Sequence, residues 1–285
     1  MDKMNLTPEE KWERATLANN FIFYKVMKNH PDACQHLIEM LLHIQIEKME
    51  IRNEEIIDVD CDAKSIRLDV FVKDTRKMYD VEMQISNTGE LPERSRYYQA
   101  LMDLDTLKAG QEYRELRDSH VIFICLEDIF KNELPISTFE NICIEDNKTK
   151  LNDRSYKHFF IAPICAKIME DEEIKSFCEF LISNKAKNVY TSDLNKYVID
   201  AKHNMQWRAQ FMTWERQRTY DFNAGKNEGR EEGISIGLAQ GAHDKAIETA
   251  RNMLTNSISV EITAKCTGLS VEEIESLKPE ILSTK

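Results

Sequence analysis

The stretch SIRLDVFV at residues 65–72, followed by MYDVEMQI at residues 78–85, decides the fold of this 285-residue chain. Polar and apolar side chains alternate along both segments, which is typical of strands because successive side chains of a strand point to opposite faces. The intervening KDTRK at residues 73–77 is polar and predicts a turn. The sequence therefore predicts a β-hairpin on whose second strand Asp80, Glu82 and Gln84 share one face.

The segments on both sides of this hairpin predict an α/β core. Thr7, Pro8 and the two glutamates after them form a helix-start signal, and apolar residues recur at helical spacing further along. The expected helices cover residues 7–24, 31–46 and 92–110, and the further expected strands cover residues 120–126, 139–144 and 156–161. This order of elements predicts a sheet flanked by helices, after which the chain is mainly helical.

The composition indicates a soluble globular protein. The chain has 38 basic and 50 acidic residues, a net charge of −12, and 42% hydrophobic residues with only six prolines. No apolar run approaches the roughly 20 residues that span a membrane, and the N-terminus lacks the apolar segment of a signal peptide. We therefore expect a cytoplasmic protein with no membrane partner. The acidic charge argues against wholesale coating of nucleic acid but leaves a local basic groove open.

Cysteine and histidine usage argues against a zinc site. The seven cysteines form no Cys-x-x-Cys pair, and the seven histidines form no His-Glu-x-x-His motif. The cysteines are expected to be reduced thiols. Any metal ion in this protein would be held by carboxylates.

The carboxylates of the hairpin are the candidate metal ligands. A turn near residues 74–76 brings Asp69 and Glu82 to neighbouring positions, where the two would repel unless a cation sat between them. Oxygen ligands of this kind hold Mg²⁺ beside phosphate substrates. Gln84 faces the same site, and its amide can orient a water or a phosphate oxygen. The alternative, which spacing alone favours, is that Asp69, Asp80, Glu82 and Gln84 form the solvent-exposed face of an amphipathic hairpin.

The helix expected after the hairpin carries residues suited to nucleic acid. Arg94 and Arg96 could grip phosphates, because a guanidinium binds them through two parallel hydrogen bonds. Tyr97 and Tyr98 could stack on an unpaired base. Tyrosines on a helix that packs against a sheet are more often core residues, so the arginines are the stronger candidates.

A glycine repeat marks the C-terminal part of the chain. Five of the eight glycines recur every fourth residue from Gly225 to Gly241. In a helix they would form a stripe that a second helix can approach closely, and because they would cost about 4–5 kcal/mol relative to alanine, we expect such a helix to be packed or dimeric. A flexible charged linker is the equally weighted alternative.

The last forty-odd residues have a helix-turn-helix pattern. A short helix at residues 260–265, a glycine turn at Gly268 and a capped helix from Ser270 follow a helical segment at residues 243–254. The second helix carries glutamates at positions 272, 273 and 275, which are a poor surface for phosphates. A small protein-packing unit is therefore favoured over a DNA reader.

Residues 67–70 and 79–84 resemble the Asp…Glu-x-Gln variant of the PD-(D/E)XK nuclease superfamily. The whole chain resembles the recombination-promoting nuclease/transposase family, from ANNFIF at 18–23 through the hairpin and RSRYY at 94–98 to the glycine repeat and the TGLS tail at 267–270. The resemblance implies an α/β, restriction-endonuclease-like fold, in which a mixed sheet flanked by helices presents metal ligands from a central hairpin.

The resemblance also implies residue roles. Asp69 and Glu82 would bind Mg²⁺ or Mn²⁺, the main-chain carbonyl of Met83 would add a ligand, and Gln84 would stand where many members of the superfamily have lysine. The missing lysine leaves the water-activating group open. Asn20 stands where an acid is expected, and Glu39 is a further candidate acid whose more ordinary role is to face solvent.

Three domains and one leading function follow. We expect a nuclease-like domain at residues 1–200, a helical arm with the glycine repeat at 201–242 and a small helical unit at 243–285. The function expected is a metal-dependent DNA endonuclease linked to DNA recombination or mobile elements, with catalytic Asp69, Glu82 and Gln84, DNA-binding Arg94 and Arg96, and self-association through the C-terminal helices. The alternatives are a non-catalytic DNA-binding or oligomerisation protein of a mobile-element or phage-defence system, or an interaction protein whose tail regulates the nuclease domain.

Overall fold

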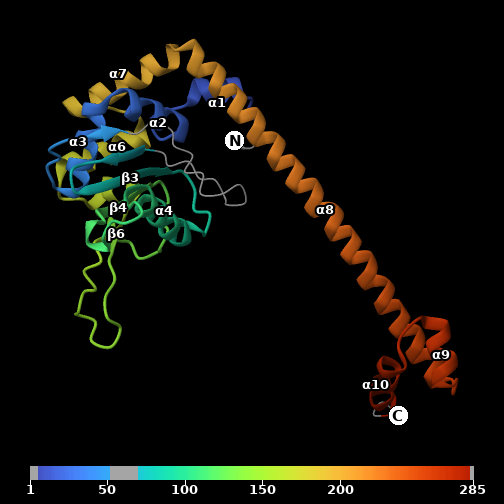
Figure 1. Cartoon of the computed structure of the whole chain (residues 1–285). Coiled ribbons are helices and arrows are strands. Elements are labelled where there is room, and N and C mark those ends of the chain that lie inside the picture. The colour runs from blue at the N-terminus through green and yellow to red at the C-terminus, as the bar shows by residue number, and fades with distance from the viewer. Residues whose placement is uncertain (1–5, 52–69, 283–285) are drawn as a thin grey trace. The chain divides into compact units, whose positions relative to one another are not determined.

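The structure, a computed structural model, describes residues 6–51 and 70–282 (Figure 1). The chain divides into two compact units, one ending at Thr213 and one beginning at Trp214. In the first unit, helices cover a six-stranded mixed sheet, so the predicted α/β core is confirmed. None of the helices in the described ranges has the length and apolar character needed to cross a membrane.

The sheet has the strand order β1-β2-β3-β4-β6-β5. The strands are β1 (Glu50–Ile51), β2 (Val70–Lys73), β3 (Lys77–Gln84), β4 (Asp118–Cys125), β5 (Ile136–Phe139) and β6 (Ser155–Ile161). The three central strands β3, β4 and β6 run parallel, and the remaining neighbours pair antiparallel. Strand β3 therefore lies inside the sheet, with a hydrogen-bonded strand on each side.

The predicted hairpin is confirmed over its described part. Strands β2 and β3 pair antiparallel, with Val70 opposite Val81 and Phe71 opposite Asp80, and the turn joins Lys73 to Lys77. Asp69 lies outside the described residues. Its expected position beside Glu82 therefore stays a prediction.

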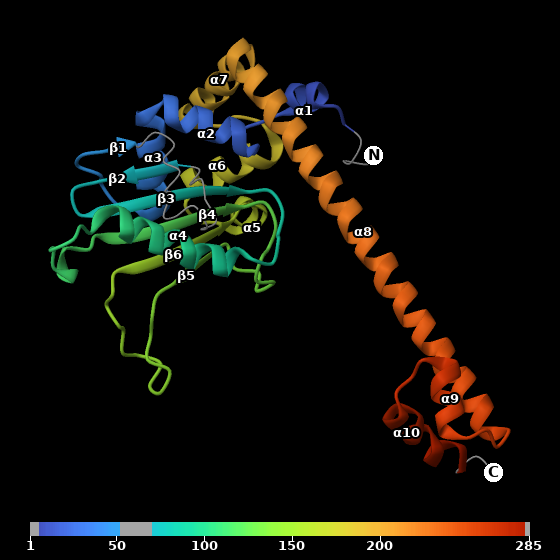
Figure 2. The same cartoon turned by 45° about the vertical axis from the view of Figure 1, so that its right-hand side comes forward.

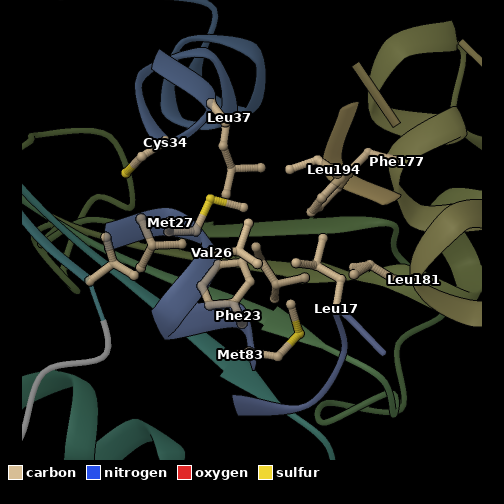
Figure 3. Packing of buried hydrophobic residues seen from close by; sticks show 14 of the residues in the cluster. Leu17, Phe23, Val26, Met27, Cys34, Leu37, Met83, Phe177, Leu181 and Leu194 are labelled. Carbon is tan, nitrogen blue, oxygen red and sulfur yellow. The ribbon is translucent and has the colours of Figure 1, made fainter. Parts of the chain in front are cut away.

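Helices cover both faces of the sheet. The helices of the first unit are α1 (Pro8–Arg14), α2 (Asn20–Asn29), α3 (Pro31–Leu42), α4 (Leu91–Thr106), α5 (Ala162–Ile168), α6 (Glu172–Ser183), α7 (Val189–His203) and a 3₁₀ turn (Tyr113–Glu115). Residues of α2, α3, α6 and α7 form the larger core with Val81 and Met83 of β3 (Figure 3). Helix α4 packs on the opposite face, where Leu91, Tyr98 and Met102 join apolar residues of β4 and β6 (Figure 2).

The N-terminal helix is shorter than expected. Thr7 caps α1 through a capping box with Glu10, as predicted, but α1 ends at Arg14 and a separate helix α2 begins at Asn20. The side chain of Asn19 accepts hydrogen bonds from the backbone N–H groups of Phe21 and Ile22 and so caps α2. This second cap explains why the prediction of one helix into residue 24 was wrong.

Two further element boundaries differ from the prediction. Helix α3 ends at Leu42 and not at residue 46, because His43 adopts the left-handed conformation that ends helices. Strand β5 spans Ile136–Phe139 and lies before the expected 139–144 segment, of which Ile142 makes only an isolated bridge to Lys150. The other predicted elements of this unit lie within a few residues of their expected ranges.

The C-terminal unit is helical. Helix α8 (Met205–Thr255) begins in the first unit, where Phe211 belongs to the larger core, and continues into this unit. Helices α9 (Val260–Thr267) and α10 (Val271–Leu282) follow it, with Gly268 in the left-handed turn between them. The repeat glycines lie inside α8, so their segment is helical and the flexible-linker alternative is wrong. A Cβ added at any of the five would meet nothing within 4 Å among the described residues. Ala250, Leu269, Ile274 and Leu277 form a small separate core.

Candidate functional site

Three polar side chains of β3 are buried under α4. The exposed fractions of Asp80, Glu82 and Gln84 are 0%, 2% and 7%. They alternate with Val81 and Met83, which point into the larger core on the opposite face. The alternative of a solvent-exposed polar face is therefore wrong for these three residues, because α4 covers the face on which they lie. Burying a carboxylate is costly unless a cation or hydrogen bonds compensate it.

Arg94, in the first turn of α4, supplies a cation to this buried face. Its Nη2 lies 3.2 Å from Glu82 Oε2 and its Nη1 donates to Gln84 Oε1 at 3.1 Å. Gln84 Nε2 lies 3.4 Å from the same Glu82 oxygen. One guanidinium thus holds a carboxylate and an amide oxygen together. The Arg94 side chain is 28% exposed, so the cluster borders on solvent at this point.

Tyr98 lies one helical turn after Arg94 and fixes the arginine. The Tyr98 hydroxyl accepts hydrogen bonds from Arg94 Nε at 3.1 Å and from Nη2 at 2.6 Å. Burial, the negative charge of Glu82 and, more weakly, that of Asp80 raise the pKa of Tyr98, whereas Arg94 opposes this shift. Tyr98 is 3% exposed and packs with Phe123 in the core under α4, so it is not available to stack on a base.

The donor atoms around Arg94 suit a hard cation. The oxygens of Glu82 and Gln84 converge on a single positive group, and oxygen ligands of this kind are those that Mg²⁺ and Mn²⁺ prefer. The described residues contain no cluster of three or more His, Cys, Asp or Glu side chains with metal-binding geometry. A complete carboxylate site would therefore need a contribution from outside the described ranges, where the predicted ligand Asp69 lies.

The structure places the other candidate residues as follows. The side chain of Met83 packs against the apolar helices, so only its main-chain carbonyl could serve the site. Arg96 is exposed and lies two residues from Arg94, a spacing that puts the two side chains on different sides of a helix. Glu39 accepts hydrogen bonds from the Ile46 N–H at 2.8 Å and from Gln35 at 3.0 Å, which is a structural role at the end of α3.

Asn20 lies in the first turn of α2. Its Oδ1 is buried and accepts no hydrogen bond from the described residues. The cap of this helix is the preceding residue, Asn19. The residue in the place of the expected acid therefore presents a neutral amide oxygen.

The contact of Arg94 with Glu82 is the feature that the sequence did not predict. The sequence predicts that Arg94 faces phosphates, whereas the structure joins it to the polar residues of β3. The available signal was the short connection between Gln84 and the start of α4 at Leu91, which keeps the first turn of the helix near the end of the strand. If that turn covers the polar face of β3, a basic residue in it is needed to compensate the buried carboxylate.

Thiol chemistry is not a feature of this region. The six cysteines within the described ranges are free, which agrees with the expected reduced state. Burial raises the pKa of Cys125, at the end of β4, to about 12. In this environment the thiol is protonated near neutral pH, which does not favour a role as a nucleophile.

A mixed sheet flanked by helices, with a carboxylate and an amide two residues apart on a central strand, is consistent with the PD-(D/E)XK class of nuclease folds. The sequence model of PD-(D/E)XK nuclease family transposases matches residues 19–221, and the chain belongs to this family. No curated protein and no solved structure matches the chain. The family membership confirms the predicted restriction-endonuclease-like fold and indicates a nuclease or transposase-like function on DNA. Nucleases of this kind generally use divalent metal ions.

Proposed function

We propose that the chain is a Mg²⁺- or Mn²⁺-dependent DNA endonuclease that hydrolyses phosphodiester bonds in recombination or in the movement of DNA elements. The observation that carries the proposal is the buried pair of oxygen donors, Glu82 and Gln84, which converge on one positive group under α4. Family membership supports the same chemistry.

The metal ligands in this proposal are Asp69, Glu82 and the main-chain carbonyl of Met83. A divalent ion held by them would supply a water of lowered pKa and would stabilise negative charge on the phosphate. Glu82 is buried, so its charge is little screened and its attraction for a cation is stronger than that of a surface glutamate.

The chain's own groups position the reactants. Gln84 carries no charge but can donate through its amide to the attacking water or to a phosphate oxygen. If a divalent ion were held by Glu82, Arg94 would be able to bind a phosphate through two parallel hydrogen bonds. Arg96 is exposed on the same helix and adds a second contact to the DNA backbone. Cleavage occurs in one step, without a covalent intermediate.

The C-terminal unit mediates self-association in this proposal. Its long helix exposes apolar side chains one turn apart, Ile234 at 52% and Leu238 at 71%, next to the glycine stripe. Light scattering should give the full chain the mass of a dimer or larger oligomer, and the double substitution Ile234→Lys/Leu238→Lys should give the monomer mass. A wild-type chain that is monomeric at micromolar concentration contradicts self-association without affecting the nuclease proposal.

Cleavage of supercoiled plasmid tests the nuclease proposal. The wild type should nick or linearise the plasmid with Mg²⁺ or Mn²⁺ and not with chelator, and Asp69→Asn and Glu82→Gln should each lose at least about a hundredfold in rate. Glu93→Gln is the matched control, because this exposed glutamate neighbours Arg94 and undergoes the same change of side chain. If the wild type and Glu82→Gln give the same rate of plasmid cleavage, the cleavage does not come from this site, and the non-catalytic DNA-binding alternative is favoured.

A further inference from the structure

A basic pocket lies at the end of the sheet where β3 begins. It is an open cavity of about 620 Å³ between the β2–β3 turn, the end of α4 and the segment that leads into β4. Five basic side chains and two acidic ones line it, a local charge of +3 in a chain whose net charge is −12. The basic residues are Arg76, Lys77, Arg114, Arg117 and Arg154. Such a concentration of one charge in a concave surface focuses the field on the pocket.

Main-chain carbonyls orient two of the arginines. Arg117 Nη1 donates to the main-chain carbonyl of Asp74 at 2.7 Å, and Arg154 Nη2 donates to that of Arg114 at 3.2 Å. A carbonyl orients a guanidinium but does not cancel its charge. The side chain of Arg76 is exposed and makes no hydrogen bond or ion pair with any described residue.

The acidic groups of the pocket are engaged mainly elsewhere. The Glu115 carboxylate accepts from the Glu112 N–H at 2.9 Å and from Gln111 at 3.0 Å, where it closes a capping box. Asp118 lies 3.6 Å from Arg154 and compensates it in part, and Arg114 pairs with Glu112. The positive charge that remains comes chiefly from Arg76, Lys77 and Arg117.

We infer that this pocket binds phosphate groups of the DNA backbone at a point away from Glu82. The inference rests on the proposed function, because it takes DNA as the substrate. Lys77 and Glu82 are five residues apart on β3, which corresponds to about 17 Å at the rise of a strand. Successive phosphates on one strand of a duplex advance about 3.4 Å along its axis. A DNA that reaches both places must therefore extend at least about five nucleotides from the cleaved bond.

Binding measured without metal tests the inference. Fluorescence anisotropy of a labelled duplex of about 20 base pairs in chelator, over a range of salt concentrations, reports phosphate contacts while cleavage is off. Arg76→Glu should weaken binding about tenfold and lower the slope of log K against log salt by about one. Arg114→Glu, at a side chain 82% exposed, should weaken binding in the same direction. The affinity for a duplex too short to extend five nucleotides from the site should be the same for the wild type and Arg76→Glu.

Lys185→Glu is the matched control, because it makes the same change of charge at an exposed position between α6 and α7, outside the pocket. Equal affinities of Arg76→Glu and Lys185→Glu for the duplex overturn the inference. The inference is also overturned if Arg76→Glu weakens the binding of inorganic phosphate or a mononucleotide but not the binding of the duplex, because the pocket would then bind a small ligand.

The two proposals fail separately. If Arg76→Glu binds the duplex as the wild type does while Glu82→Gln abolishes plasmid cleavage, the nuclease stands and the pocket is not a backbone site. If Arg76→Glu binds weakly while the wild type never cleaves, the pocket stands and the chain is a DNA-binding protein. Circular dichroism of each variant establishes that it is folded before binding is compared.

Discussion

Replacing Arg94 by methionine separates the positive charge at the candidate site from the volume that fills it. Methionine retains most of the length and apolar surface of the arginine stem. It removes the hydrogen bonds to Gln84 Oε1 at 3.1 Å, to Glu82 Oε2 at 3.2 Å and to the Tyr98 hydroxyl at 3.1 and 2.6 Å. Arg94→Met therefore leaves Glu82 buried without this cation.

The expected cost follows from the burial of the two partners. Removing one member of a fully buried ion pair costs about 3–5 kcal/mol. Glu82 is 2% exposed and meets this condition, whereas the Arg94 side chain is 28% exposed and its charge is partly screened by water. We therefore expect Arg94→Met to lower the free energy of unfolding at pH 7 by about 2 kcal/mol in chelator.

A divalent ion should reverse most of this loss. If Glu82 and Gln84 are the oxygens that a metal takes, the ion replaces the missing guanidinium, and it stabilises the folded state by binding only there. The deficit of Arg94→Met should then shrink to under about 1 kcal/mol in millimolar Mn²⁺. In the wild type the ion competes with Arg94 for Glu82, so Mn²⁺ should stabilise it less.

Urea denaturation followed by circular dichroism measures both quantities. The four conditions are wild type and Arg94→Met, each in chelator and in Mn²⁺, and Arg96→Met is the control because Arg96 is exposed on the same helix. Arg96→Met should unfold as the wild type does in both solutions. An Arg94→Met deficit that is the same with and without Mn²⁺ would refute the argument that metal and guanidinium share one position. No deficit in chelator would refute the electrostatic argument itself.

Three further outcomes follow from the described contacts. Tyr98→Phe keeps the ring in the core but removes the hydroxyl that holds Arg94. We expect it to lower the free energy of unfolding in urea by roughly 1 kcal/mol and to lower the rate of plasmid cleavage by more than this loss of stability accounts for. In the single chain, Gly233→Ala adds a Cβ that meets nothing within 4 Å, so at concentrations where the chain is monomeric it should raise the free energy of unfolding by about 1 kcal/mol, measured by circular dichroism. A loss of self-association at higher concentration would show that a second helix packs closely on the glycine stripe. Burial lowers the pKa of His120 to about 3, helped by His158, and that of His158 to about 4. Because these folded values lie below the unfolded value of about 6.5, the unfolded chain binds more protons in between, and the free energy of unfolding should fall as pH drops from about 6.5 toward 4. Replacing both histidines by glutamine should flatten this part of the pH profile, and an unchanged profile would contradict the buried neutral pair.

The hairpin, α4 and the C-terminal helices could be predicted because each carries a local signal. Alternation marked the hairpin, and the capping residues Thr7 and Ser270 marked two helix starts that the structure confirms. Where two local signals competed, the prediction was wrong. The helix-start signal at Thr7 predicts one helix over residues 7–24, whereas the cap at Asn19 starts a second helix within that range.

The environment of the polar face could not be predicted from spacing. Alternation in a strand states which side chains share a face, but not what covers that face. Asp80, Glu82 and Gln84 would show the same alternating pattern in an exposed hairpin. They are buried because α4 packs on β4 and β6. The ion pair between Arg94 and Glu82 depends on the same long-range packing, so it too appears only in the folded chain.

The burial of these residues is itself an argument for function. A sheet face covered by a helix is most stable when it is apolar, and replacing a buried ion pair by well-packed apolar side chains is often neutral or stabilising. Elsewhere on this face Met78, Phe123 and Phe159 pack under α4. Two other buried polar residues of the face are matched by side chains of α4, Ser119 by Gln99 and Lys73 by Asp105. Strand β3 departs from the apolar preference of a covered face at Asp80, Glu82 and Gln84, where stability alone would favour apolar residues. Departures of this kind are expected where chemistry, and not packing, determines the residue. The burial of Glu82 and Gln84 therefore supports our proposal that these residues bind a cation.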